Sequence, residues 1–445
     1  MMDMIFTVLA ATVAGTLLAG LLAMLPGLHV YNVMGGFVVL LYYLAGRGIE
    51  LAPELFVPFF TSMIVSWSVL NTIPSVLLGA PDESALFTVL PGQKYLMMGR
   101  GYEGVLVTGV GALAGLYFLI IVVAPVASRF LPVMQSVLRP HMHWILWVII
   151  TFMLMSEWPK TGHGGAEGLR KFLAAWKTLG AGLATFVLAG LFGFLILYRS
   201  PVSVEVAFQN IMPAFVGLFA VPWCLLNAIS GTDVPPQRLS DKLEVDADVI
   251  LRSTAAGVLG GGFAAFFPIV TGGVGGMLAG HATAQRDERV FIMSQGVSKL
   301  IYYTGAYMLF FVPALGLRRG GGAWLVQGVY TPRTQHDFLM VLATIAISGA
   351  IAFLMMPFCT RLVIRLIGRI NYRSVSILSL AIILAMVAGI TGWRGLAVML
   401  VGTGIGLLPV LFGSRRLNCL GVLLLPMACN MSGIGQDVAH FLGLI

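Results

Sequence analysis

Charged residues are scarce in this chain of 445 residues. Only 10% are Asp, Glu, Lys or Arg, whereas 58% are hydrophobic, and the mean hydropathy is +0.95. Soluble domains carry about 25% charged residues, so this composition excludes a soluble globular protein, a disordered chain and a coiled coil. An all-α polytopic integral membrane protein remains. Because one spanning helix needs ~20 apolar residues, we expect about 10 to 12 membrane segments and no soluble domain.

Cysteine is also rare, and the usual catalytic motifs are missing. The four cysteines are scattered through apolar segments and form no CxxC pair, so neither a disulfide framework nor a zinc site is indicated. The sequence has no HExxH, GxSxG or phosphate-loop motif, and no pair of catalytic side chains within an apolar segment. We therefore expect a protein that is not an enzyme and that carries no metal or organic cofactor.

The formal net charge of +8 raises the question of a nucleic-acid partner. In a membrane protein, an excess of Lys and Arg is better explained by cytoplasmic loops, which are rich in both residues. We therefore expect no nucleic acid and only membrane lipids around the charged loops. The first four residues lack the basic region and cleavage site of a signal peptide, so the first segment should be retained in a multi-pass protein of the cell membrane.

The apolar segments form two sets, and the first segment of each set is interrupted. The first set lies at about 5–45, 56–78, 105–127, 144–155, 178–197 and 207–229, and the second at about 255–280, 291–315, 338–357, 375–391, 396–412 and 420–429. The interruptions fall at Pro26-Gly27 and at Pro268, which is followed by Gly272-Gly273. A broken helix at membrane depth is tolerated only where it is packed in protein or lines a cavity.

The two interrupted segments resemble each other. A shift of 242 residues aligns five identical pairs: Gly15 with Gly257, Leu17 with Leu259, Gly20 with Gly262, Ala23 with Ala265, and Pro26 with Pro268. Small residues are common in membrane helices, so chance supplies some of these pairs, but the aligned prolines favour a duplication. The sequence thus predicts a first membrane repeat at 1–230, a polar linker at 231–249 and a second repeat at 250–445.

The positions of Lys and Arg predict the orientation of the repeats. If each interrupted segment is a re-entrant hairpin, one set of loops holds 17 Lys and Arg residues and the other holds 8, with Lys299 inside a segment. The richer set should be cytoplasmic. The first hairpin then opens outward and the second inward, so the halves are inverted repeats whose broken helices meet near the midplane. If the first segment instead crosses fully, the halves are parallel.

The first break is a candidate anion site. Pro26 removes a backbone donor and Gly27 permits a turn, so the backbone leaves free amides that the next half-helix can aim at an anion. His29 and Asn32 stand on one face of that half-helix. Both can bind a carboxylate or phosphate oxygen, and His29 can also carry a proton. The alternative is that these two side chains only cap the broken backbone.

A second polar cluster follows the next apolar segment. Asn71 and Thr72 stand at its end, where carbonyl and hydroxyl oxygens could contact a substrate or coordinate Na⁺. Asp82 and Glu83 come directly after Pro81 and are candidates for binding the coupling ion or for gating. The alternative for the two acidic residues is that they cap the following helix at the surface.

The third cluster lies in the second repeat. Ser294, Gln295 and Lys299 share an apolar segment, and the second break contributes the backbone of Gly272 and Gly273. A lysine inside the bilayer must pair, face a cavity or extend to the membrane surface. We assign these five residues to substrate binding. The alternative is that Lys299 reaches the membrane surface with its long side chain.

At these motifs the sequence resembles a known family. The run 25–29 with Asn32, the run 73–83 and the segments 89–92 and 99–104 are similar to those of the large permease subunit of tripartite tricarboxylate transporters, and most of all to its stand-alone archaeal-type members. The resemblance covers about residues 15–125, and the second half matches loosely. There the family's second Pro-Gly turn appears as Pro268-Ile269, with the glycines displaced to Gly272 and Gly273.

The resemblance implies a secondary transporter that takes up carboxylates such as citrate, coupled to Na⁺ or H⁺. In the complete systems of the family, a small membrane subunit and an extracytoplasmic binding protein assist the permease. The residues themselves support an anion-binding site between two broken helices. They leave open whether the chain forms a homo-oligomer.

A second class of function uses the same site. A translocase (flippase) for an anionic lipid carrier such as polyprenyl phosphate also needs a centre that binds phosphate or carboxylate groups. The two classes differ in access, because a lipid requires a side opening between helices and apolar groove walls. The many aromatic and small residues of the segments permit either class.

The orientation can be tested by labelling single cysteines from outside intact cells. We expect the loop Arg361–Arg373 to be cytoplasmic and the loop with Arg394 to face outward, because the first is richer in arginine. In a cysteine-free background, an impermeant thiol reagent should label Thr391→Cys and leave Ser374→Cys unlabelled. The reverse pattern would overturn the topology.

Overall fold

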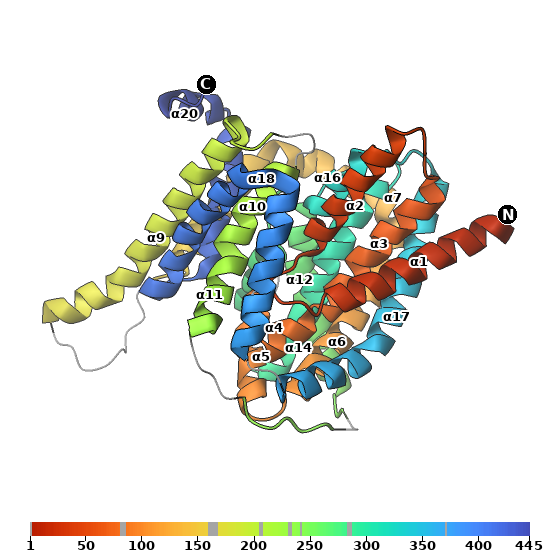
Figure 1. Ribbon diagram of the computed structural model, residues 1–445, viewed down its shortest axis with the longest axis horizontal. Helices are drawn as coiled ribbons and strands as arrows, with labels where there is room; N and C mark the ends of the chain where they lie inside the picture. Colours follow the sequence, from red (N-terminus) through yellow and green to blue (C-terminus); the bar gives the residue numbers. More distant parts are fainter. Residues whose placement is uncertain are drawn as a thin grey trace. The chain divides into compact units, whose positions relative to one another are not determined.

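The computed structural model describes residues 2–80, 86–158, 168–203, 208–229, 234–240, 243–282, 287–369 and 372–445, and all regular structure in these ranges is helical (Figure 1). The α-helices are α1 Met2–Leu22, α2 Val30–Ala45, α3 Pro53–Leu70, α4 Thr72–Leu77, α5 Leu86–Met97, α6 Gly101–Tyr117, α7 Ala124–Leu138, α8 Met142–Met155, α9 Gly168–Tyr198, α10 Phe208–Phe215, α11 Val221–Ile229, α12 Ala247–Phe266, α13 Gly272–Ala282, α14 Glu288–Leu300, α15 Ala306–Phe311, α16 Gly320–Gln327, α17 Gln335–Ile367, α18 Tyr372–Phe412, α19 Gly421–Met431 and α20 Gly435–Phe441. Three π-helical turns are η1 Phe118–Val123, η3 Val216–Ala220 and η4 Ile301–Gly305, and two 3-10 turns are η2 Arg139–His141 and η5 Arg416–Leu420.

The helices are long and apolar enough for a membrane protein. Among the described residues, eight helical stretches could cross a membrane, or nine if the pair Arg416–Met431 and Gly435–Phe441, bent by 117°, counts as one span. The stretch Gly101–Met155 has 55 residues, and the 40-residue stretch Arg373–Phe412 is interrupted at Gly392, where φ is 65° and ψ is −165°. Because a crossing needs ~20 residues, each of these two stretches is long enough for two crossings. The prediction of an all-α polytopic membrane protein is confirmed.

By their internal contacts, the helices form two compact units. The first consists of Met1–Met134 and Cys224–Leu380, and the second of Gln135–Trp223 and Ala381–Ile445. Each unit therefore contains segments of both predicted halves. The predicted boundaries at 230 and 250 concern repeats rather than compact units, so they stay a prediction.

In the second unit, α9 packs closely against α19. A methyl group at Gly193 would overlap the carbonyl oxygen of Val422, so only glycine allows the two backbones to approach this closely. Near the end of α8, the buried carboxylate of Glu157 accepts hydrogen bonds from the backbone N of Arg415 at 2.7 Å and from Asn418 Nδ2 at 3.1 Å. This carboxylate therefore fixes the start of η5.

In the first unit, the two interrupted segments pack in the same way. A side chain at Gly15 of α1 would overlap Ser62 Oγ of α3, and one at Gly257 of α12 would overlap Val297 of α14. The shift of 242 residues that aligns the two breaks also pairs these two glycines. Each half thus places its broken helix against its next long helix through an equivalent glycine contact.

The paired helices of the two halves run in opposite directions. Lys299 Nζ donates to Asn71 Oδ1 at 2.7 Å, and Oη of Tyr307, which comes later in its segment, lies 3.5 Å from Oγ1 of Thr61, which comes earlier in its own. The helix α3 is therefore antiparallel to the helix formed by α14, η4 and α15. The glycine contacts advance in the same direction along both helices of a pair. Gly15 meets Ser62 and Gly20 meets Leu70, so α1 is parallel to α3. Gly257 meets Val297 and Gly261 meets Ile301, so α12 is parallel to the helix that begins with α14. Hence α1 and α12 are antiparallel, which is the relation that inverted repeats require.

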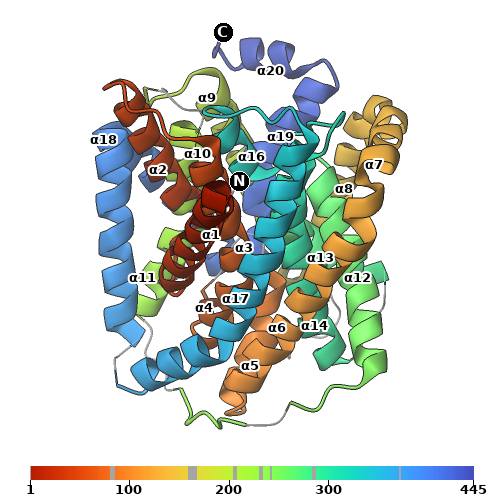
Figure 2. The same ribbon diagram turned by 90° about the vertical axis from the view of Figure 1, so that its right-hand side faces the viewer.

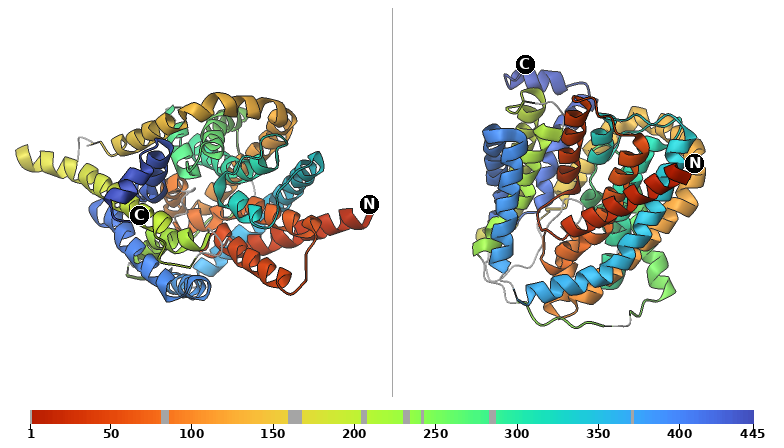
Figure 3. Two further views of the ribbon diagram at one scale, coloured as in Figure 1. Left: turned by 90° about the horizontal axis from the view of Figure 1, so that it is seen from above. Right: turned by 45° about the vertical axis from the view of Figure 1, so that its right-hand side comes forward.

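Each half also contributes a helix that packs on the broken helix of the other half. The helix α17 packs on α1 and α3, and α6 packs on α14 and α12 (Figure 2). Thr16 Oγ1 donates to Ser348 Oγ at 2.8 Å, which fixes α1 alongside α17, as Figure 3 also shows. Each half therefore covers the broken helix of the other.

Basic residues of the richer loop set gather at one end of the first unit. Lys94 pairs with Glu288, Arg289 lies near the start of α6, and the guanidinium of Arg361 lies 5.6 Å from the ring centroid of Tyr102. These loops are far apart in sequence, and their convergence agrees with the loop alternation that the re-entrant hairpins imply. Which side of a membrane this end faces stays a prediction.

The two breaks share one backbone conformation but not one residue type. Gly27 has φ 81°, and the residue at the shift of 242, Ile269, has φ 64°. Glycine adopts this left-handed region freely, whereas an L-residue loses roughly 1–2 kcal/mol there, and a β-branched one is a true outlier. The second hairpin therefore has the same turn as the first, but Ile269 raises the conformational energy of its backbone there.

Exchanging these two residues tests the strain. We expect Ile269→Gly to raise the free energy of unfolding by up to about 1 kcal/mol, because the strain relieved exceeds the entropy cost of glycine. Gly27→Ile should lower it by about 1–2 kcal/mol. Unfolding in detergent micelles measures both. A destabilising Ile269→Gly together with a neutral Gly27→Ile would contradict the equivalence of the two turns.

The glycine contact of α12 gives a second test with an internal control. Gly257→Ala should destabilise the protein by about 1–3 kcal/mol, because the added methyl group meets Val297 and the carbonyl oxygen of Ser294. Gly262→Ala lies on the same helix and has nothing within 4 Å of its added methyl group, so it should be neutral or stabilising. Thermal unfolding of the two variants should differ accordingly, and equal midpoints would show that the contact is loose.

Candidate functional site

Both breaks lie beside the π-helical turn η4. At the first break, His29 Nε2 lies 2.9 Å from Tyr303 Oη. At the second break, Ala265 of α12 lies within van der Waals reach of Gly305. A π-helical turn inside an α-helix often marks a functional position, because it widens the backbone and displaces side chains. The turn η4 thus stands between the two broken helices.

Lys299 is the charged residue at the centre of this arrangement. It is the second-last residue of α14, two residues before η4 begins, its side chain is 2% exposed, and its Nζ donates to Asn71 Oδ1 at 2.7 Å. Asn71 stands at the junction of α3 and α4 and belongs to the other predicted half. A charged lysine at the centre of a bilayer costs roughly 3 kcal/mol on insertion scales. The side chain is therefore buried within the protein instead of extending to the surface.

Buried polar atoms without a hydrogen-bond partner occur on the elements around Lys299. They are Asn32 Nδ2 on α2, Trp67 Nε1 on α3, Thr271 Oγ1 before α13, Gln295 Nε2 and Ser298 Oγ on α14, and Thr304 Oγ1 on η4. The three nitrogens can only donate, and the three hydroxyls can donate as well. Each unpaired buried group costs about 1–3 kcal/mol, so these elements present an excess of donors that a ligand or water would satisfy.

The second hairpin presents an uncapped helix N-terminus. Thr271 is 4% exposed and stands where a cap of α13 would be, yet its hydroxyl has no partner. The first intrahelical bond is from Gly275 N to Thr271 O at 3.1 Å, and Gly272 and Gly273 begin the helix without side chains. The first amides of a helix carry a partial positive charge and readily bind an anion. Gln295 lies directly against this helix, at Gly276.

The first hairpin has the opposite arrangement. His29 caps α2, because its Nδ1 accepts a hydrogen bond from Tyr31 N at 3.2 Å. The capping alternative therefore describes the geometry of His29, whereas Asn32 is 5% exposed and its Nδ2 has no partner. The donors available to an anion are thus richer at the second hairpin than at the first.

The other predicted site residues take various places. Pro26 and Gly27 form the turn of the first hairpin, Ser294 Oγ donates to the backbone oxygen of Phe291 at 2.7 Å, and Thr72 is buried next to Asn71 at the start of α4. The structure thus brings Asn71 and Lys299 into direct contact, with Gln295 one turn away on the same helix. Asp82 and Glu83 lie outside the described residues.

Arg319 was not predicted as a site residue. Its Nε donates to the carbonyl oxygen of Phe266 at 2.8 Å, which ties the start of α16 to the end of α12. Burial lowers the pKa of Arg319 to about 10, so it stays charged at neutral pH. The next residue, Gly320, lies close to Tyr31 Oη. In the sequence Arg319 looks like a loop charge, and only the following run of three glycines indicates a close approach of the backbone.

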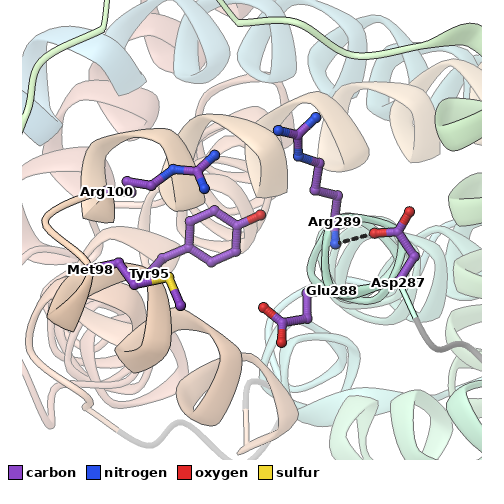
Figure 4. Close-up of a pocket in the computed structure, with 6 residues that line it drawn as sticks. All are labelled: Tyr95, Met98, Arg100, Asp287, Glu288 and Arg289. Carbon is purple, nitrogen blue, oxygen red and sulfur yellow. Dashed lines mark hydrogen bonds between the residues drawn. The ribbon is translucent and has the colours of Figure 1, made fainter.

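A cavity of about 440 Å³ opens at the start of α14 (Figure 4). It is lined by Tyr95, Met98, Arg100, Asp287, Glu288 and Arg289. Arg100 of this lining binds Glu103 with two hydrogen bonds, 2.7 and 2.6 Å long, and Lys94 of α5 pairs with Glu288 of α14. Burial and the negative charge of Glu103 raise the pKa of the Tyr95 hydroxyl. Ionic contacts thus join the first half to the second at this end.

A smaller cavity, about 270 Å³ in volume, lies at the other end of the same helix. It is lined by residues 310–316, which form the end of α15 and the turn after it, and by residues 332–334, which precede α17. Lys299 and Tyr303 lie between the two cavities along the helix formed by α14, η4 and α15. The donor-rich region is therefore flanked by one cavity on each side.

Comparisons with known proteins identify the family of this chain. The family described as the tripartite tricarboxylate transporter TctA family matches residues 9–421, a range that contains both breaks, Asn71, Lys299 and Arg319. An uncharacterized protein of Methanocaldococcus jannaschii is 24% identical over 430 residues, which cover 93% of this chain and 96% of the relative. No solved structure matches the chain. The resemblance inferred from the residues is confirmed, and the chain belongs to the tripartite tricarboxylate transporter TctA family.

Proposed function

We propose that the protein is a secondary active transporter of a small organic anion, similar to a di- or tricarboxylate, which binds between the two broken helices. The observation that carries this proposal is the buried ammonium group of Lys299 among side-chain donors that have no partner. Membership of a transporter family gives the general function. The charge and the donors give the chemistry of the site.

A carboxylate fits the donors in kind. Its oxygens accept hydrogen bonds only, and bonds between ionised partners are roughly twice as strong as neutral ones. Lys299 supplies the positive charge, and Gln295 Nε2, the Thr271 hydroxyl and the first amides of α13 supply directed donors. Binding of the anion offsets the desolvation of the lysine, which explains why a charge is kept at this depth.

The inverted arrangement supports alternating access. The site uses residues of both halves, and the two cavities lie toward opposite ends of one helix. In this proposal, the pair Lys94–Glu288 and the contact of Arg289 with Glu103 hold one end closed, and they separate when that end opens. A small membrane subunit, an extracytoplasmic binding protein and a coupling cation, Na⁺ or H⁺, complete the proposal, with the protein in the cell membrane.

Replacing Lys299 tests the site. In proteoliposomes, Lys299→Met should lower kcat/KM for uptake of radiolabelled citrate or succinate about 10- to 100-fold, because a hydrogen bond to a charged group is worth about 1.5–3 kcal/mol. Lys177→Met removes the same charge from an exposed position of α9 and should transport like the wild type. Lys299→Gln, which keeps a donor for Asn71, should also lose transport.

Thermal unfolding separates loss of function from loss of fold. If folded Lys299→Met transports as well as Lys177→Met, Lys299 is structural and the proposed site is wrong. If the wild type binds no carboxylate but moves polyprenyl phosphate between leaflets, the lipid-translocase alternative replaces this proposal. Loss of this lipid translocation in Lys299→Met would then show that the charge of Lys299 binds the phosphate group of the lipid.

A further inference from the structure

Both ring nitrogens of His29 are engaged. A backbone N–H can only donate, so the Nδ1 that faces Tyr31 N at 3.2 Å must carry a lone pair. The neutral ring then has its proton on Nε2, which donates to Tyr303 Oη at 2.9 Å. The hydrogen-bond network therefore assigns His29 as the neutral tautomer with the proton on Nε2.

A second proton on His29 is incompatible with its cap on α2. If Nδ1 binds a proton, two N–H groups face each other, and the hydrogen bond to Tyr31 N is lost. The first turn of α2 then has an unsatisfied amide beside a new N–H donor. Both donors can be satisfied together by one anion, because a carboxylate has two oxygens that accept.

The second hairpin has no titratable residue at the equivalent position. The shift of 242 residues places Thr271 opposite His29, and the hydroxyl of Thr271 leaves α13 uncapped. One hairpin thus has a helix end that is open to an anion, and the other has a helix end that a histidine closes. Of these two equivalent positions, only the one at the first hairpin therefore carries a side chain that can bind a proton.

We propose that His29 is the proton-binding site that couples a proton to the transported anion. This inference rests on the proposed function. A proton from water binds Nδ1, the cap of α2 opens, and the anion accepts hydrogen bonds from Nδ1–H and Tyr31 N. When the anion leaves, Nδ1 returns its proton to water and accepts from Tyr31 N again.

The charges around His29 favour this coupling. The ionisable groups on the elements that pack around it are Tyr31 on α2, Tyr302 and Tyr303 on η4, Tyr307 on α15, Lys299 on α14, Arg319 before α16 and Glu54 on α3. Lys299 and Arg319 are cations that oppose a third positive charge, so in the empty site only an acidic pH drives a proton onto His29. A bound anion removes this opposition, and by linkage a bound proton strengthens anion binding by the same factor.

Hydrogen exchange tests the proton switch without any substrate. The full chain in nanodiscs is compared at pH 8 and pH 5.5, with exchange rates corrected for their intrinsic pH dependence. In the wild type, the amides of 31–33 should exchange about fivefold faster at pH 5.5, which corresponds to the loss of one helix cap worth about 1 kcal/mol. In His29→Asn, which caps but does not titrate, their rates should be unchanged. The amides of α13 serve as the internal reference.

Calorimetry then tests the coupling to an anion. Citrate is titrated into both proteins at pH 6.5 in two buffers of different ionisation heat. The wild type should take up about one proton more per citrate than His29→Asn, as linkage requires.

The two experiments fail in different ways. Equal exchange behaviour of the wild type and His29→Asn, including no response to pH in either, would overturn the role of His29. If citrate does not bind, the carboxylate of the proposed function is wrong, while the exchange result still decides whether His29 binds the proton. If citrate binds with equal proton uptake in both proteins, the coupling is wrong and the anion site stands.

Discussion

The hydrogen bond between Lys299 and Asn71 is the interaction on which the first unit depends. A buried ammonium group must have a polar partner, and this partner, at the junction of α3 and α4, is 228 positions away in the chain. The bond fixes the antiparallel contact of α3 with α14, and the glycine contacts of α1 and α12 then place both hairpins on either side of η4. The hydrogen bond and the glycine contacts together thus bring the two breaks to either side of η4.

The two hairpins keep the same backbone but have different chemistry. Their turns have positive φ at Gly27 and Ile269, yet His29 closes one helix end and Thr271 leaves the other open. Two turns of equivalent backbone conformation thus carry different side chains at the helix ends that follow them. Ile269 adopts this conformation although it is unfavourable for a β-branched residue, so the fold requires this turn despite its conformational energy.

The sequence predicted the elements of the site better than their partners. Hydropathy identified the membrane helices, and Pro26 and Pro268 marked both breaks, because these are local properties of the chain. The contact of Lys299 with Asn71, and the choice of His29 between capping and binding, depend on packing between distant segments and could not be read from spacing. Arg319 was missed because a loop arginine gives no periodic signal, and its burial arises only when α16 meets α12.

The glycine contacts also have a mechanical consequence. Where two backbones touch without intervening side chains, no rotamer change can relieve a sliding movement, so α1 must travel with α3 and α12 with α14. The short turns after the broken helices are then the hinges, and each helix pair moves as one rigid body. Motion at the two hairpins is thereby transmitted over the whole length of a span rather than absorbed near the turn.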